Sequence, residues 1–136
     1  MRKNVLVASA LLVLCAAALT GGIMWWNGGF AVQATVIAPS KADISRAETL
    51  MPTDGSLAKV YARSCMACHS VADAQAPLTG HINGWTQRFS ERGSRGLLKS
   101  AKEGFGNMPA MGLCTDCTDE QYTALISFMS GREDSQ

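Results

Sequence analysis

The sequence predicts an all-α domain that follows a single apolar N-terminal segment. Apolar residues recur at helical spacing on both sides of Cys65-Met66-Ala67-Cys68-His69, a C-x-x-C-H run near the middle of the chain. The alternating patterns typical of strands are weak along all 136 residues. We therefore expect short helices in one small domain, packed around whatever the C-x-x-C-H run binds.

The run Cys65-Met66-Ala67-Cys68-His69 is the attachment signature of a c-type haem. Residues three apart lie on one helix face, so a single turn presents both thiols to the porphyrin edge. Each thiol adds across one vinyl group, and His69 then falls under the iron as its proximal ligand. The alternatives are a redox pair and a zinc site. A redox pair would need a βαβ context. A zinc site would need four ligands, and the chain has only two His.

Composition sets limits on the partners. Twelve basic and eleven acidic residues give no global basic excess, so we expect no nucleic-acid partner. We also expect no small-molecule substrate. A domain of this size is marginal on its own apolar core. A buried porphyrin would supply much of that core, so we expect the haem-free chain to fold poorly.

Residues 1–27 are predicted to form a membrane anchor, a single transmembrane helix. The apolar run Val5–Trp26 is long enough, because about 20 residues cross a membrane. Arg2 and Lys3 mark the cytoplasmic end, and the paired tryptophans that end the run suit the opposite interface. The haem domain would then face the periplasm from the bacterial inner membrane.

A cleaved signal peptide is the competing interpretation of this segment, because Val32-Gln33-Ala34 resembles a small-residue cleavage site. The haem domain would then be soluble in the periplasm. Residues 28–53 mix glycine, proline and scattered charges, which predicts a flexible linker. The sequence leaves open whether Ile44–Met51 forms a short helix. The haem domain is expected over 54–132, followed by a tail at 133–136.

Helix signals divide the haem domain into four segments. The first helix opens at Asp54 and leads directly into Cys65. Two short helices follow, marked by apolar residues one turn apart: Trp85 with Phe89, and Leu97 and Leu98 with Ala101. In the last helix, Thr118 and Gln121 form a capping-box pattern at the start, and Gly131 can end it.

A carrier haem needs a sixth ligand, and Met or His is the usual choice. Met108 is the leading candidate, because it lies in a glycine-rich loop and Pro109 restricts its backbone to extended conformations. Met111 is the rival methionine. His81 is a rival histidine, which we expect at the surface ahead of the second helix.

The segment 54–132 resembles class I c-type cytochromes, and within them the cytochrome c5 group. The resemblance includes a Met-Pro segment at Met108, followed closely by a C-x-x-C pair and a final helix. It implies the class I cytochrome c fold around one covalently bound haem c, with Met108 as the axial ligand. It also implies a disulfide between Cys114 and Cys117. Thr118 stands where a second attachment motif would need His, so a second haem is not expected.

The same resemblance implies contacts around the haem ligands. The carbonyl of Pro77 would accept the second imidazole N–H of His69, which fixes the tautomer. Trp85 would lie near the haem, where its indole contacts a propionate or simply packs in the core. Tyr61 and Phe128 occupy the aromatic positions where the first and last helices cross.

These features predict an electron carrier rather than an enzyme. The expected function is single-electron transfer in a respiratory chain, between membrane complexes such as a quinol-oxidising complex and a terminal oxidase. The alternative is a fixed haem-bearing subunit of a larger membrane oxidoreductase complex. An enzyme or gas sensor would need an open iron site, which a filled sixth position argues against.

One stretch of the haem domain is strongly basic, and the C-terminal residues are acidic. The basic segment carries five positive charges against Glu91: Arg88, Arg92, Arg95, Lys99 and Lys102. It forms either an ordinary solvated helix face or a patch that steers the carrier toward an acidic partner surface.

Overall fold

The computed structural model of the chain describes residues 38–132. These residues belong to one compact unit. The predicted anchor at 1–27 and the alternative cleavage site lie outside the described residues. Within 38–132, no helix combines the length and the apolar character that a membrane crossing requires.

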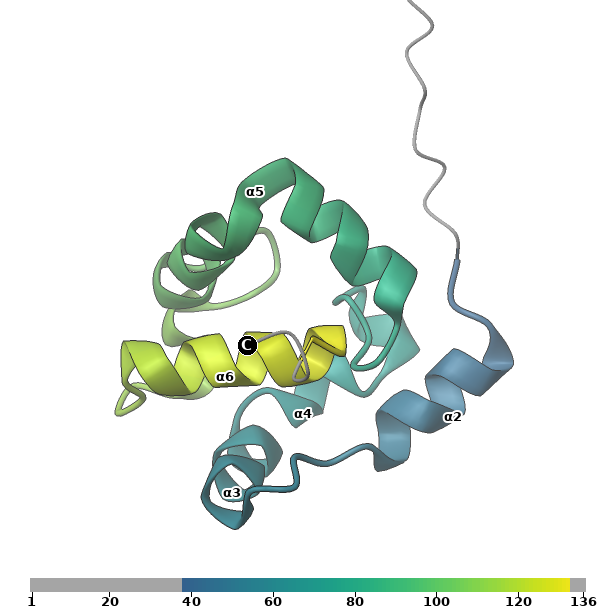
Figure 1. Cartoon of the computed structure of the whole chain (residues 1–136), viewed down its shortest axis with the longest axis horizontal. Coiled ribbons are helices and arrows are strands. Elements are labelled where there is room, and N and C mark those ends of the chain that lie inside the picture. Colours follow the sequence, from purple (N-terminus) through teal and green to yellow (C-terminus); the bar gives the residue numbers. More distant parts are fainter. Residues whose placement is uncertain (1–37, 133–136) are drawn as a thin grey trace, which may run out of the picture. The chain divides into compact units, whose positions relative to one another are not determined.

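The described part of the chain is helical, with no strand between residues 38 and 132. Its elements, in chain order, are α2 (Lys41–Thr49), α3 (Gly55–Arg63), α4 (Met66–His69), the 3₁₀ turn η1 (Ala72–Ala74), α5 (Ile82–Glu103), the 3₁₀ turn η2 (Ala110–Leu113) and α6 (Asp119–Ser130). Helix α6 packs against both α5 and α3. In Figure 1 it runs between the arch of α5 and the pair α3 and α4. The all-α prediction is confirmed.

The start predicted for the first helix and the capping box predicted for the last are both present. Asp54 caps α3 by accepting a hydrogen bond from the amide of Leu57 at 2.7 Å. Thr118 and Gln121 form the reciprocal capping box of α6. Gly131 ends α6 in the left-handed conformation, with φ of 67°. Local hydrogen bonding therefore fixes these helix ends as the sequence predicts.

Helix α5 joins the two short helices that the sequence predicts. Gly93 interrupts it with φ of 62° and ψ of 175°, which are not helical values. Positive φ is open to glycine because it lacks a Cβ atom. The two halves therefore meet at a kink, and the basic segment lies on both sides of it.

The linker expected over 28–53 differs from the structure in its second half. Ser40 caps helix α2, and this helix packs on the domain with Ala47 fully buried. The guanidinium of Arg46 donates a hydrogen bond to the carbonyl of Gly80 at 3.4 Å. Because burial and this contact hold α2 in place, the segment that the structure describes is not a free tether.

The core lies where α3, α5 and α6 meet. Tyr61 of α3 and Phe128 of α6 contact edge to face, with ring centroids 5.0 Å apart. This confirms the helix crossing that the aromatic pair predicts. The buried side chains around them include Val60, Trp85, Leu97, Tyr122, Leu125, Ile126 and Met129. One side of this core is hollow, which leads to the site.

Candidate haem-binding site

The C-x-x-C-H run folds into one turn. Cys65 starts the short helix α4, and its carbonyl accepts hydrogen bonds from the amides of Cys68 at 3.2 Å and His69 at 3.0 Å. Cys65 is half-buried and Cys68 is exposed, and neither thiol is in a disulfide. Both thiols and the imidazole are therefore presented by a single turn of backbone.

The imidazole of His69 is held by a backbone carbonyl. Its Nδ1 lies 2.8 Å from the carbonyl oxygen of Pro77. A carbonyl oxygen only accepts, so Nδ1 carries the proton and Nε2 keeps a lone pair. Burial lowers the pKa of His69, which favours the neutral ring that binds metals. The amide of Thr79 donates to the carbonyl of His69 at 2.8 Å and holds the following segment close.

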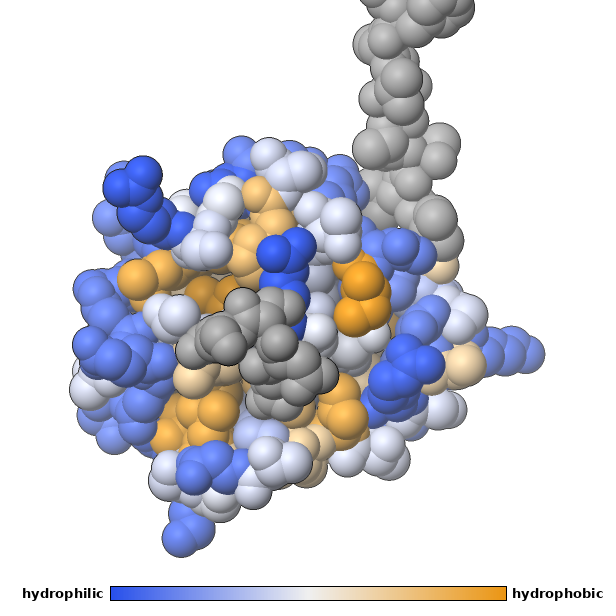
Figure 2. All heavy atoms as spheres, viewed as in Figure 1, coloured by the Kyte–Doolittle hydropathy of each residue, from blue (hydrophilic) through white to orange (hydrophobic). Residues whose placement is uncertain are grey.

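A cavity of about 270 Å³ opens beside α4. Cys65, Cys68 and His69 line it, and so does Met108 from the loop before η2. Most of its wall is apolar, and large apolar side chains such as Phe105 are partly exposed. Figure 2 shows apolar residues gathered toward the middle of one face, within a largely hydrophilic outline. Paired thiols, a neutral imidazole and a thioether on an apolar wall fit a covalently attached haem.

The three candidates for the sixth ligand occupy different places. Met108 is the one that lines the cavity. Met111 packs on the core, and its carbonyl accepts a hydrogen bond from the hydroxyl of Tyr122 at 2.9 Å. His81 is only 6% exposed, so the expectation that it lies at the surface is wrong. Gly84 has no side chain and leaves room for the His81 ring, away from the cavity.

Trp85 forms part of the wall next to His69. Their ring centroids are 5.8 Å apart and the rings are roughly parallel. The indole Nε1 donates a hydrogen bond to the carbonyl of Leu78 at 2.9 Å. An indole has one N–H, and here that N–H is paired with the carbonyl of Leu78. The propionate contact that the resemblance implies stays a prediction.

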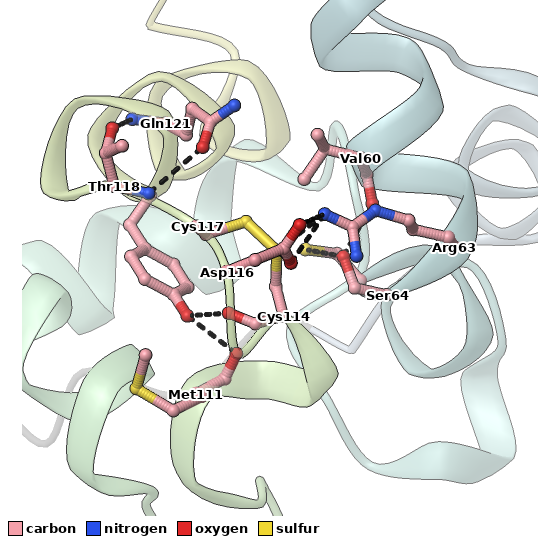
Figure 3. Close-up of polar contacts among 11 residues, drawn as sticks. Val60, Arg63, Ser64, Met111, Cys114, Asp116, Cys117, Thr118 and Gln121 are labelled. Carbon is pink, nitrogen blue, oxygen red and sulfur yellow. Dashed lines mark hydrogen bonds and ion pairs between the residues drawn. A yellow bond between two sulfur atoms is a disulfide. The ribbon is translucent and has the colours of Figure 1, made fainter.

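A disulfide joins Cys114 and Cys117 at the end of the loop that follows Met108. Figure 3 shows the carboxylate of Asp116 facing the guanidinium of Arg63, with N–O distances of 2.8 and 2.9 Å. These hydrogen bonds hold the pKa of Asp116 below its usual range. The same guanidinium lies 3.3 Å from Sγ of Cys114. Helix α3 is thereby linked to the segment before α6.

Two side chains of the site were missed by sequence reasoning. Arg88 and Arg92 belong to the basic segment. The charge pattern predicts only a solvated helix face or a docking surface for this segment. Both line the cavity. For Arg92 the available signal was the pair Gly93-Ser94 that follows it, because glycine–serine pairs are common places for a helix to kink.

A helical domain built around such a cavity, with two thiols and an imidazole on one turn, belongs to the class of c-type haem proteins. Comparison with known proteins gives the family. Residues 52–129, more than half of the chain, match the family described as "Cytochrome C oxidase, cbb3-type, subunit III". The chain therefore belongs to the cytochrome c family.

Two relatives carry the name cytochrome c5. The protein from Azotobacter vinelandii is 38% identical over 73 residues, which is 53% of this chain and 88% of that protein. The protein from Ectopseudomonas mendocina is 36% identical over 73 residues, covering 53% of this chain and 84% of that protein. No solved structure gives a significant match. The chain is thus a mono-haem c-type cytochrome with covalently bound haem c, an electron carrier and not an enzyme.

Proposed function

We propose that this cytochrome passes single electrons along a respiratory chain at the bacterial inner membrane, with its haem domain in the periplasm. The haem supplies the one-electron couple, and the polypeptide sets its ligands and surroundings. Cys65 and Cys68 form the thioether bonds, His69 is the proximal ligand, and Met108 is the sixth ligand. The observation that carries this assignment is the placement of all four side chains on the wall of one apolar cavity.

The chain's own contacts suit this role. The hydrogen bond from His69 to the carbonyl of Pro77 orients the imidazole and strengthens its donation to the metal. His–Met ligation raises the reduction potential, and an apolar wall that excludes water tunes it further. His69 and Met108 would both hold the haem iron, an arrangement that suits one-electron transfer rather than the binding of a substrate.

The cysteines indicate the cellular compartment of the haem domain. Haem attachment uses Cys65 and Cys68, so Cys114 and Cys117 are the pair left for a bond within the domain. A disulfide persists in an oxidising compartment such as the periplasm. We infer that the Cys114–Cys117 disulfide forms in the exported protein. The apolar segment within 1–27 would either anchor the protein to the inner membrane or direct its export.

The cytochrome could meet its electron donor and acceptor in two ways. A mobile carrier would shuttle between a quinol-oxidising complex and a terminal oxidase. The alternative is a fixed haem-bearing subunit, which the name of the matching family favours, because it describes a subunit of an oxidase. A native gel of mild-detergent extracts, stained for haem, separates them. Migration near the protein's own mass supports the carrier, and migration with a large complex supports the subunit.

The axial ligand is tested by Met108→Ala, with Met111→Ala as the matched control. We expect Met108→Ala to lose the methionine–iron charge-transfer absorption of the ferric protein and to bind carbon monoxide at neutral pH. Met111→Ala should keep the absorption, because its side chain packs on the core rather than lining the cavity. If Met108→Ala keeps the spectrum of the unsubstituted protein, the assignment is wrong.

A further inference from the structure

The kink in α5 brings one arginine of the basic segment back over its own helix. Arg92 is the residue before Gly93, where the helical path breaks. Its Nη1 donates a hydrogen bond to the hydroxyl of Ser100 at 3.4 Å. A Cβ atom on Gly96 would lie 2.9 Å from Cβ of Arg92, so the absence of a side chain at Gly96 makes room for this path.

The guanidinium of Arg92 ends over an aromatic ring. Its central carbon is 3.6 Å from the ring centroid of Phe105, within the range of a cation–π contact. Phe105 is 52% exposed, so its ring is not anchored in the core. Gly104 and Gly106, on either side, both have positive φ, which shows a backbone built for a tight turn. The arginine thus covers part of a ring that is half exposed.

Phe105 is joined directly to Met108. The amide of each residue donates to the carbonyl of the other, both at 3.0 Å, and this pair of bonds closes the loop. Arg92, Phe105 and Met108 all line the same cavity. A displacement of the Phe105 ring would therefore be carried through two hydrogen bonds to the residue that faces the haem.

We propose that Arg92 is a positioning residue, which clamps the ring of Phe105 and so keeps Met108 bound to the haem iron. The proposal rests on the role of Met108 proposed above. The clamp acts on the lifetime of the methionine–iron bond. Arg92 also lines the cavity, so the test must separate an effect that passes through Phe105 from a direct effect on the haem.

The test measures how fast the loop opens in the full, haem-loaded ferric protein. Imidazole in large excess replaces the methionine, and its limiting rate reports loop opening. We expect Arg92→Gln and Phe105→Leu each to raise this rate about two- to five-fold, the factor that an exposed cation–π contact is worth. The double variant should be no faster than the faster single variant. Arg95→Gln removes the same charge three positions on and should not change the rate.

Conservative variants separate the clamp from a charge effect. Arg92→Lys keeps a cation, and Phe105→Tyr keeps a ring, so both should stay near the unsubstituted rate. If Arg92→Gln matches Arg95→Gln, or if the two single effects multiply in the double variant, the clamp is refuted. If the unsubstituted ferric protein lacks the methionine–iron absorption, the assignment of Met108 as a ligand is wrong. If that absorption is present and the Arg92 and Phe105 variants keep the unsubstituted exchange rate, only the role of Arg92 is refuted.

Discussion

The phenol oxygen of Tyr61 lies 2.8 Å from the hydroxyl of Thr79, and both side chains are fully buried. Thr79 also donates its amide to the carbonyl of His69. The bond between Tyr61 and Thr79 therefore ties α3 to the segment that holds His69.

We expect Tyr61→Phe to lower the free energy of unfolding by about 1–3 kcal/mol, because the buried hydroxyl of Thr79 loses its partner. Denaturant unfolding of the haem-loaded protein measures the change. Adding Thr79→Val to Tyr61→Phe removes the unsatisfied hydroxyl and should restore part of the loss. Equal stability of Tyr61→Phe and the unsubstituted protein would show that the bond contributes nothing net.

Gly104 has φ of 87°, and a Cβ atom there would lie 3.0 Å from the carbonyl oxygen of Met108 and from the amide nitrogen of Ala110. We expect Gly104→Ala to cost about 1–3 kcal/mol, the range for such backbone conformations in residues other than glycine. It should also weaken the iron ligation that we propose for Met108, which would be detected as carbon monoxide binding at neutral pH.

Gly55 offers the matched control for this substitution. It opens α3, has no positive φ, and a Cβ atom there would have nothing within 4 Å. Gly55→Ala should be neutral or stabilising by up to about 1 kcal/mol. A similar loss of stability at both glycines would contradict the argument from backbone conformation.

Acid should weaken the link between Asp116 and Arg63. The pKa of Asp116 is lowered in the folded protein by its hydrogen bonds with Arg63. A lowered folded pKa means that the contribution is complete above the unfolded pKa, near 4, and is lost as pH falls through the folded pKa. We expect Asp116→Asn to be less stable than the unsubstituted protein at neutral pH, and the gap between them to close below about pH 4. Melting temperatures across that range measure it.

Removal of the disulfide should destabilise the folded protein. Replacing both Cys114 and Cys117 by Ala should cost about 2 kcal/mol, because the closed loop is short. Denaturant unfolding of the haem-loaded protein, with and without reductant, measures this. The double variant should be insensitive to reductant, whereas the unsubstituted protein should fall to its level when reduced. Equal stability throughout would show that the bond is dispensable.

Steering by the basic segment is testable at Arg95. Two of its other members already face carboxylates, since Lys102 pairs with Asp119 at 2.7 Å and Lys99 with Glu103 at 3.5 Å. The structure gives Arg95 no carboxylate partner within 38–132. We expect Arg95→Glu to slow oxidation of the reduced cytochrome by membranes from the organism that produces it, at low salt. At high salt the variant and the unsubstituted protein should be oxidised at the same rate.

Lys59, on α3 and outside the basic segment, supplies the control for steering. Lys59→Glu makes the same change of charge, so it should leave the rate nearly unaffected if the basic segment is the docking surface. Equal slowing by both variants would instead indicate a general effect of net charge.

Local features of this fold were predictable, and long-range ones were not. Thr118 with Gln121, and Asp54 with the helix after it, cap through hydrogen bonds that span three residues. Such bonds depend on the nearby sequence alone. The docking of α2 through Arg46 and Gly80 depends on residues 34 positions apart, which no local pattern encodes.

The site follows the same division. The C-x-x-C-H spacing fixes the attachment turn by chemistry, so those residues could be named at once. The partner of the Trp85 indole could not, because the carbonyl of Leu78 competes for its single N–H only once the chain has folded. The contact of Arg92 with Phe105 likewise depends on the kink at Gly93 and on a loop beyond the end of α5.

The cavity beside α4 also affects the protein before haem is attached. Without haem, the mainly apolar wall of this cavity of about 270 Å³ faces water, and the domain lacks the stabilisation that covering this wall provides. A small domain has little stability to spare. A chain that has not yet received its haem is therefore a natural target for proteolysis. The steady amount of this cytochrome should then follow the supply of haem, and not only the rate of synthesis.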